Sequence, residues 1–121
     1  MNSMEGVAVQ SDQAPPTASE LLRDFAPKLS SLTREMLFGE IWERSELPKR
    51  DRSMITVAAL VAAGNTENLP SHLRLARRNG LSEDELKELI LHLAFYAGWP
   101  RAMSAMLVAR DVFEGGTDGG R

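Results

Sequence analysis

The chain has 121 residues, of which 43% are hydrophobic and 26% charged, as in a folded domain rather than a disordered chain. A net charge of −3 gives no reason to expect a nucleic-acid partner. No apolar run approaches the roughly 18 residues of a membrane helix, and the lack of cysteine excludes disulfides and thiol chemistry. We therefore expect one domain in a reducing, cytoplasmic compartment, without a secretory signal.

The two ends of the chain differ in composition from its middle. Residues 1–18 are rich in Ser, Gln and Pro, and Pro15-Pro16 opposes helix formation, so we expect a flexible arm. Residues 115–121 contain four glycines and are expected to form a flexible tail. Residues 19–114 between them are expected to form the folded domain.

Two helices are expected at the start of this domain. Ser19 is a suitable N-cap for a short helix that reaches about Pro27. A second helix is expected from about Ser30 to Arg44, because apolar residues recur there with helical spacing: Leu29, Leu32, Met36, Leu37 and Ile41. Glu40 is expected to point along this buried stripe.

The middle of the chain predicts two further helices. One starts near Pro48, a favourable first-turn residue, and ends at Gly64. Its residues 54–63 are apolar on all sides, which is typical of a helix enclosed by others. Thr66 or Asn68 can cap the next helix. One face of that helix carries Leu69, His72, Leu73 and Ala76, and the other carries Arg74, Arg77 and Arg78.

Two helices complete the domain. Ser82 and Glu85 form a capping box for the fifth helix. Its core stripe consists of Leu86, Leu89, Ile90, Leu93 and Ala97. A second, partly aromatic stripe consists of Glu88, His92, Phe95, Tyr96 and Trp99. Gly98 and Pro100 mark a break, after which a last helix is expected from about Arg101 to Glu114.

These elements predict an all-α domain of about six helices with short connections. The all-apolar third helix and the aromatic stripe of the fifth offer more apolar surface than a small monomer can bury. An apolar patch left in water is a liability, and closed homo-oligomers commonly cover such patches. We therefore expect the chain to associate with copies of itself.

Three stretches of the sequence resemble the carboxymuconolactone decarboxylase family. They are KRDRSMITVAALVAAGN (49–65), LPSHLRLARRNGLS (69–82) and HLAFYAGWPRAMSA (92–105). FGEIWER (38–44) adds to the likeness, which covers about residues 20–114. The resemblance implies an all-helical fold of the alkyl hydroperoxidase D type, usually assembled as a trimer, hexamer or similar ring.

The alkyl hydroperoxidase D proteins of the same superfamily use a Glu, a CxxC pair and a His. The corresponding positions in this chain are Ser53, Asn65, Asn68 and His72. Thiol peroxidase and disulfide reductase chemistry require a thiolate. Because the acid and both thiols are replaced, we expect no thiol peroxidase activity, and the remaining His has another role.

The family resemblance implies decarboxylation of a small lactone dicarboxylate. The electrons left by the departing carboxylate flow into the lactone carbonyl, so the ring itself holds the charge and no cofactor or metal is expected. The protein must anchor an anionic substrate, stabilise the developing oxyanion and deliver a proton.

Three residues are candidates for these tasks. His72 is the candidate proton donor or carbonyl polariser, because its ordinary pKa lies near operating pH; otherwise it is a core histidine bonded to a carbonyl. Glu40 is the candidate orienting partner of His72, or else pairs with Arg44. Arg52 is the candidate carboxylate anchor, or else forms an ion pair, with Arg50 as its substitute.

Four further side chains are candidates for lining the substrate pocket: Tyr96, His92, Trp99 and Trp42. Aromatic stripes with helical spacing also occur in cores and interfaces, so that alternative stays open for each. His92 is the second-choice acid. The chain has no HxxxH or ExxH pair, and no metal site is expected.

The sequence therefore predicts a cofactor-free lyase that acts on a small anionic ring compound, without nucleic-acid or membrane partners. One alternative is a non-catalytic ligand-binding or scaffold oligomer that has kept the cavity. Another is a related lactone isomerase or hydrolase.

Overall fold

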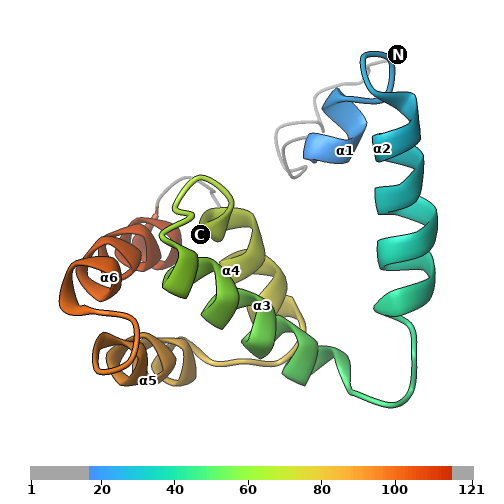
Figure 1. Ribbon diagram of the computed structural model, residues 1–121. Coiled ribbons are helices and arrows are strands. Elements are labelled where there is room, and N and C mark those ends of the chain that lie inside the picture. Colours follow the sequence, from blue (N-terminus) through green and yellow to red (C-terminus); the bar gives the residue numbers. More distant parts are fainter. Residues whose placement is uncertain (1–16, 116–121) are drawn as a thin grey trace. The chain divides into compact units, whose positions relative to one another are not determined.

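The computed structural model describes residues 17–115 and is helical throughout, with no strand in that range (Figure 1). The predicted all-α fold of about six helices is confirmed. The predicted N-terminal arm and C-terminal tail lie outside the described residues, apart from positions 17, 18 and 115. No helix in the described range is long and apolar enough to cross a membrane. The chain divides into two units between Glu43 and Arg44.

The first unit begins with the short helix α1 (Ala18–Leu21). Its N-cap is Thr17 and not the predicted Ser19. The Thr17 hydroxyl accepts a hydrogen bond from the backbone N–H of Glu20 (3.1 Å), and the Glu20 carboxylate accepts one from the backbone N–H of Thr17 (3.0 Å). A capping box requires Glu or Gln three residues after the cap, and Ser19 is followed at that distance by Leu22.

The predicted second helix is an α-helix only in its first part. α2 (Pro27–Ser31) continues directly as the π-helix η2 (Leu32–Ile41). A π-helix bonds each N–H to the carbonyl five residues earlier, and the bond from Trp42 N to Leu37 O (2.9 Å) follows this pattern. The wider turn changes which side chains share a face.

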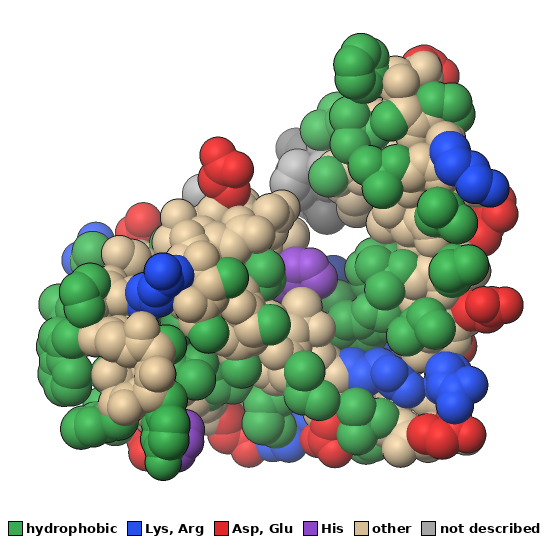
Figure 2. Space-filling model, in the orientation of Figure 1, with side chains coloured by type: hydrophobic (Ala, Val, Ile, Leu, Met, Phe, Trp, Pro, Cys, Tyr) green, Lys and Arg blue, Asp and Glu red, His purple; other side chains and the backbone are tan. Residues whose placement is uncertain are grey.

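The apolar stripe of this segment was expected to be buried, and that expectation is wrong. The stripe residues are 37–57% exposed: Leu29, Leu32, Met36, Leu37 and Ile41. Glu40 is exposed as well. Within residues 17–43, the buried side chains are those of Ser30 and Trp42. A unit of this size cannot form a core of its own, and Figure 2 shows hydrophobic side chains along the surface of α2 and η2.

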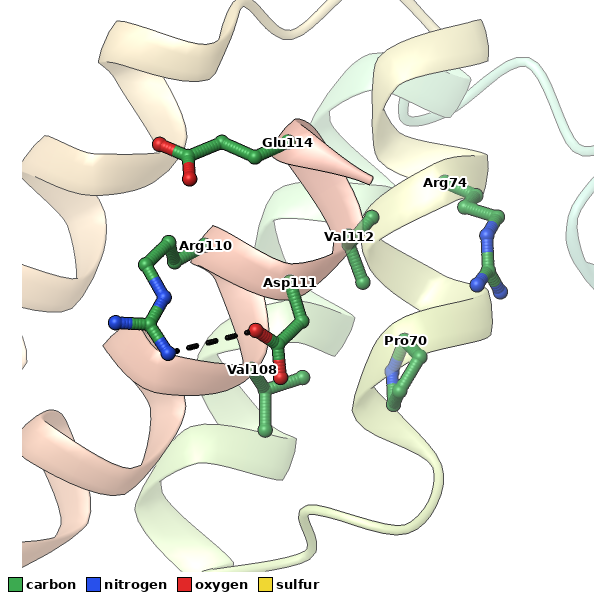
Figure 3. A pocket seen from close by; sticks show the side chains of 7 residues that line it. All are labelled: Pro70, Arg74, Val108, Arg110, Asp111, Val112 and Glu114. Atoms are coloured by element: carbon green, nitrogen blue, oxygen red, sulfur yellow. Dashed lines mark ion pairs between the residues drawn. The ribbon is translucent and has the colours of Figure 1, made fainter. Parts of the chain in front are cut away.

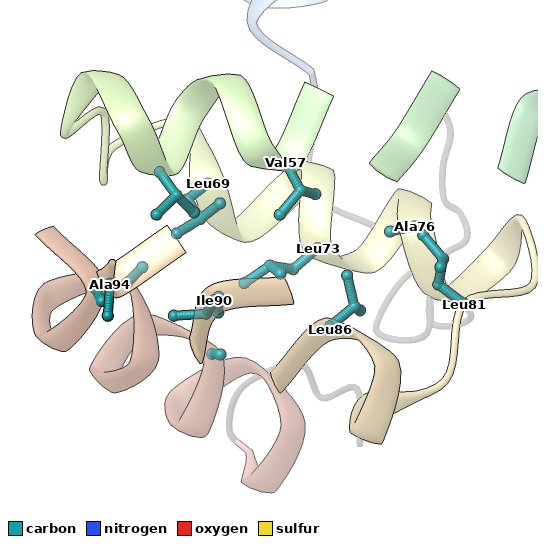
Figure 4. Close-up of a cluster of buried hydrophobic side chains, with 12 residues drawn as sticks. Val57, Leu69, Leu73, Ala76, Leu81, Leu86, Ile90 and Ala94 are labelled. Atoms are coloured by element: carbon teal, nitrogen blue, oxygen red, sulfur yellow. The ribbon is translucent and has the colours of Figure 1, made fainter. Parts of the chain in front are cut away.

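The second unit consists of α3 (Lys49–Ala63), α4 (Leu69–Arg78), α5 (Glu83–Ala94) and α6 (Trp99–Glu114). These helices follow the prediction closely, although α6 starts two residues early, directly after Gly98 (φ 109°). They surround one cluster of buried side chains (Figure 4). The cluster consists of Val57, Val61, Leu69, Leu73, Ala76, Leu81, Leu86, Ile90, Ala94, Ala102, Ala105 and Ala109.

The helix ends of this unit are fixed by local contacts. Gly64 ends α3 in the left-handed region (φ 71°), as its position predicts. The predicted capping box of α5 is confirmed, since Glu85 N donates to Ser82 Oγ (3.0 Å) and Ser82 N to Glu85 Oε1 (2.9 Å). Asn79, at the end of α4, donates from Nδ2 to the hydroxyl of Ser53 near the start of α3 (3.0 Å). The two helices therefore run antiparallel.

The expectation that α3 is enclosed on all sides is wrong. Its buried residues are Ser53, Val57 and Val61, which lie on one face, whereas Ile55 on another face is 56% exposed. The other helices of the unit pack against the first face only. The other helices of this unit therefore leave one apolar face of α3 uncovered.

Candidate functional site

His72 lies in the first turns of α4, at the edge of the core. The side chains that share its helix face are buried, and the imidazole itself is half-buried. Its Nδ1 is buried and has no hydrogen-bond partner among the described residues. Burial removes water from the ring and lowers the pKa of His72 below its ordinary value. Burial therefore favours the neutral imidazole.

A neutral imidazole can act on a substrate in two ways. It carries one N–H that can donate to a developing oxyanion and one lone pair that can accept a proton. Buried polar atoms are almost always paired. The unpaired Nδ1 of His72 therefore distinguishes it from a core histidine that is bonded to a carbonyl.

Arg52, the predicted anchor, is bonded to backbone carbonyls of the segment that precedes α3. Its Nε donates to the carbonyl of Leu47 and its Nη2 to the carbonyl of Arg44, each at 3.2 Å. The Ser53–Asn79 contact places the start of α3 beside the end of α4, whereas His72 lies seven residues earlier on α4, about 10 Å along the helix axis. The bonds of Arg52 instead fix the segment that leads into α3.

The substitute anchor, Arg50, is also engaged. Its guanidinium pairs with the carboxylate of Glu85 on α5, and with Asp51 at 4.0 Å. The backbone N–H of Ser82, followed by the guanidinium of Arg50, holds the pKa of Glu85 below its ordinary value. Arg50 therefore ties α3 to the capped start of α5.

Glu40 belongs to the first unit and is exposed on η2. Its carboxylate makes no hydrogen bond or ion pair within residues 17–115. Arg44, its alternative partner, pairs with Glu46 at 3.5 Å. The described contacts therefore give Glu40 no structural role of its own.

The predicted lining residues of α5 and α6 form an exposed aromatic surface. The rings of His92 and Tyr96 stack with centroids 4.9 Å apart, and Phe95 meets Trp99 edge to face at 5.5 Å. Tyr96 is 78% exposed and Trp99 55%. Trp42 differs, since it is buried in the first unit with its ring 5.6 Å from that of Phe38. Within the second unit these aromatic rings do not enclose a cavity.

A groove with a volume of about 610 Å³ lies between α4 and α6 (Figure 3). Its lining consists of Pro70, Arg74, Val108, Arg110, Asp111, Val112 and Glu114. His72 does not line this groove, because residues two apart on a helix point to nearly opposite sides. The groove is therefore separate from the candidate histidine. No group of three His, Asp or Glu residues in positions 17–115 is arranged to hold a metal ion.

Sequence reasoning missed two polar side chains near the start of α4. The Oδ1 of Asn65 accepts hydrogen bonds from the backbone N–H (3.2 Å) and the side-chain amide (3.1 Å) of Asn68. Arg101 of α6 packs on Gly64, where a methyl group would lie 2.5 Å from its Nη1. The only signal in the sequence was that Asn65 occupies a thiol position and that Arg101 lies inside a family-like stretch.

Comparison with known proteins agrees with the resemblance. A model of the carboxymuconolactone decarboxylase family matches residues 27–111. The chain is 43% identical to 4-carboxymuconolactone decarboxylase of Acinetobacter baylyi, over 78% of this chain and 71% of that protein. It is 31% identical to nitrosuccinic acid decarboxylase npaB of Metarhizium robertsii, over 96% of this chain and 84% of that protein. An uncharacterized 15.0 kDa protein of Paracoccus denitrificans is 24% identical, over 76% of this chain and 70% of that protein.

Proposed function

The chain belongs to the carboxymuconolactone decarboxylase family, and from that premise we propose that it releases CO₂ from a small acid such as 4-carboxymuconolactone. The observation that carries this proposal is the 43% identity to a protein of that activity, over 78% of the chain. The matched range 27–111 includes the whole of α4 and its half-buried histidine.

The names of two relatives point to a substrate class. A carboxymuconolactone and a nitrosuccinic acid both carry more than one carboxyl group and one strongly electron-withdrawing group. In the first, the electron pair left by CO₂ is delocalised into the lactone carbonyl, and in the second into the nitro group. We therefore propose that this chain acts on a small dicarboxylic acid with its own electron sink, without a cofactor.

His72 is the residue that we propose for the chemistry. Breaking the bond to CO₂ leaves an electron pair that forms a dienolate, and a proton must then be added to its carbon. Because Nδ1 is buried, Nε2 is the nitrogen that we expect to reach the substrate. The neutral ring would donate an Nε2–H hydrogen bond to the developing oxyanion, and the proton delivered to carbon would be one that the ring takes up from water.

Two other roles remain predictions. Glu40 is exposed on η2 and carries a carboxylate that could orient an imidazole. Arg52 would have to exchange its bonds to Leu47 and Arg44 for a substrate carboxylate in order to act as the anchor. The pocket-lining roles of Tyr96, His92, Trp99 and Trp42 are likewise untested.

Self-association is part of the proposal. Ile55 on α3, and Phe95 and Tyr96 beyond the end of α5, are 56%, 71% and 78% exposed in the single chain. Exposed apolar surface of this kind is usually covered by another subunit. We propose a homo-oligomer, of which a trimer and a hexamer are the forms that the family resemblance suggests.

The test is incubation of the purified chain with 4-carboxymuconolactone, following both CO₂ release and the organic product. We expect one CO₂ per substrate lost, and a drop in kcat of about 10²–10⁴-fold in His72→Ala. Lys87→Ala, at an exposed position of α5, is the control and should retain activity. An altered product without CO₂ would identify an isomerase or hydrolase, and saturable binding without turnover a binding protein.

A further inference from the structure

An arginine without an ion-pair partner lies where α6 meets the end of α3. Arg101 packs its guanidinium on Gly64, and a methyl group at that glycine would lie 2.5 Å from Nη1 and 3.4 Å from Cζ. Arg101 makes no hydrogen bond or ion pair within residues 17–115. The carboxyl end of α3 attracts a cation to this place, but it leaves the guanidinium N–H groups available to a ligand.

The residue after Gly64 presents a second donor. Both hydrogen bonds from Asn68 end on Oδ1 of Asn65, which fixes the orientation of the Asn65 carboxamide. Its Nδ2 is therefore directed away from Asn68, and it has no acceptor among the described residues. Asn65 is half-buried and thus holds a donor in place before any ligand arrives.

Of the two donors, Asn65 lies close to the candidate histidine along the chain. Asn68 precedes His72 by four residues, about one helical turn or 5.4 Å. Side chains of a helix lean toward its N-terminus, so His72 leans toward the turn that Asn68 begins. A small acid that contacts Asn65 at one end can therefore approach the imidazole with the other.

Resting on the decarboxylase activity proposed above, we propose that Arg101 and Asn65 bind one carboxylate of the substrate while His72 acts at its reacting end. A guanidinium and an amide together offer a carboxylate charge-assisted hydrogen bonds from two sides. This assigns the anchoring task to α6 and to the α3–α4 connection.

The test is steady-state kinetics of two variants with 4-carboxymuconolactone. Arg101→Met removes the guanidinium but keeps the aliphatic stem, and should raise KM by at least about tenfold with little change in kcat. Asn65→Asp keeps the oxygen that Asn68 needs and replaces the outward donor with a charge, so KM should rise similarly. Arg78→Met, at an exposed position of α4, is the control and should leave KM unchanged.

A change in KM has to be separated from a change in folding. Thermal unfolding of each variant, followed by circular dichroism, should match the wild-type chain within a few degrees. His72→Ala should lower kcat instead, which distinguishes chemistry from anchoring. An unchanged KM in a well-folded Arg101→Met variant overturns the inference.

Failure of the proposed function can be recognised separately. If the wild-type chain releases no CO₂, the decarboxylase assignment fails, whereas titration calorimetry with succinate still tests the anchor. Binding of succinate that is lost in Arg101→Met supports the carboxylate site. Equal binding by both chains, or none by the wild-type chain, rejects it.

Discussion

The side-chain amide of Asn79 donates a hydrogen bond to the buried hydroxyl of Ser53. The family resemblance aligns Ser53 with the glutamate that thiol-dependent members of the superfamily are expected to carry, and Ser53 is 1% exposed. In this chain the position joins two helix ends. A residue that corresponds to a catalytic acid elsewhere thus has a structural contact here.

Replacing Ser53 tests that contact. Ser53→Ala should lower the free energy of unfolding by about 1 kcal/mol, because the amide of Asn79 loses its acceptor. The double variant with Asn79→Ala should lose less than the sum of the single changes. Denaturant titrations measure these changes. Ser104→Ala, at an exposed position of α6, is the control and should change the free energy of unfolding by no more than about 0.5 kcal/mol.

Gly64 should be intolerant of a side chain for two reasons that can be separated. Gly64→Ala forces a β-carbon into the left-handed region, at about 1–2 kcal/mol, and also pushes against Arg101. Adding Arg101→Ala should recover only the part of the lost free energy of unfolding that comes from the contact with Arg101. Gly80→Ala, where φ is 105° and the nearest atom would lie at 4.0 Å, should show strain that Arg101→Ala does not relieve. Equal responses at both glycines would contradict the packing of Arg101.

The lowered pKa of His72 makes stability depend on pH in a defined direction. Between the lowered pKa and the ordinary value of about 6.5, the unfolded chain binds more protons than the folded chain. The free energy of unfolding should therefore rise with pH through this interval and level off above it. His72→Gln should flatten the rise in urea titrations between about pH 5 and 8. An unchanged pH profile in this variant would contradict the lowered pKa of His72.

Association through the aromatic surface can be tested by placing a charged side chain on that surface. Phe95→Glu places a carboxylate on a side chain that is 71% exposed in the single chain. If another copy covers this surface, the variant should sediment as a smaller species than the wild-type chain. Lys87→Glu, an exposed change of charge on α5, serves as the control. Identical sedimentation of all three proteins would place the interface elsewhere.

The second unit was largely predictable because its signals are local. Ser82 with Glu85, Gly64 after an apolar run, and the spacing of Leu69, Leu73 and Ala76 each predict one helix or its end. The first unit was less predictable. Nothing in the apolar spacing distinguishes a π-helix from an α-helix.

From the sequence, the candidate site could be predicted only for residues whose position depends on a single helix. The position of His72 beside a buried face follows from the period of α4. The proximity of Arg101 to Gly64 depends on how α6 meets the end of α3, which no local pattern encodes. The guanidinium of Arg52 suits a carboxylate, but its bonds to Leu47 and Arg44 arise from the path of the preceding segment.

The exposed apolar stripe of the first unit affects how the protein responds to oxidants. With no sulfhydryl in the chain, oxidants are directed to thioethers, and Met36 on η2 is 51% exposed. Sulfoxide formation there would place a polar S–O group, with a chiral sulfur, on an apolar face. Oxidation of Met36 would then change which surfaces the first unit can pack against, without any chemical change at the imidazole of α4.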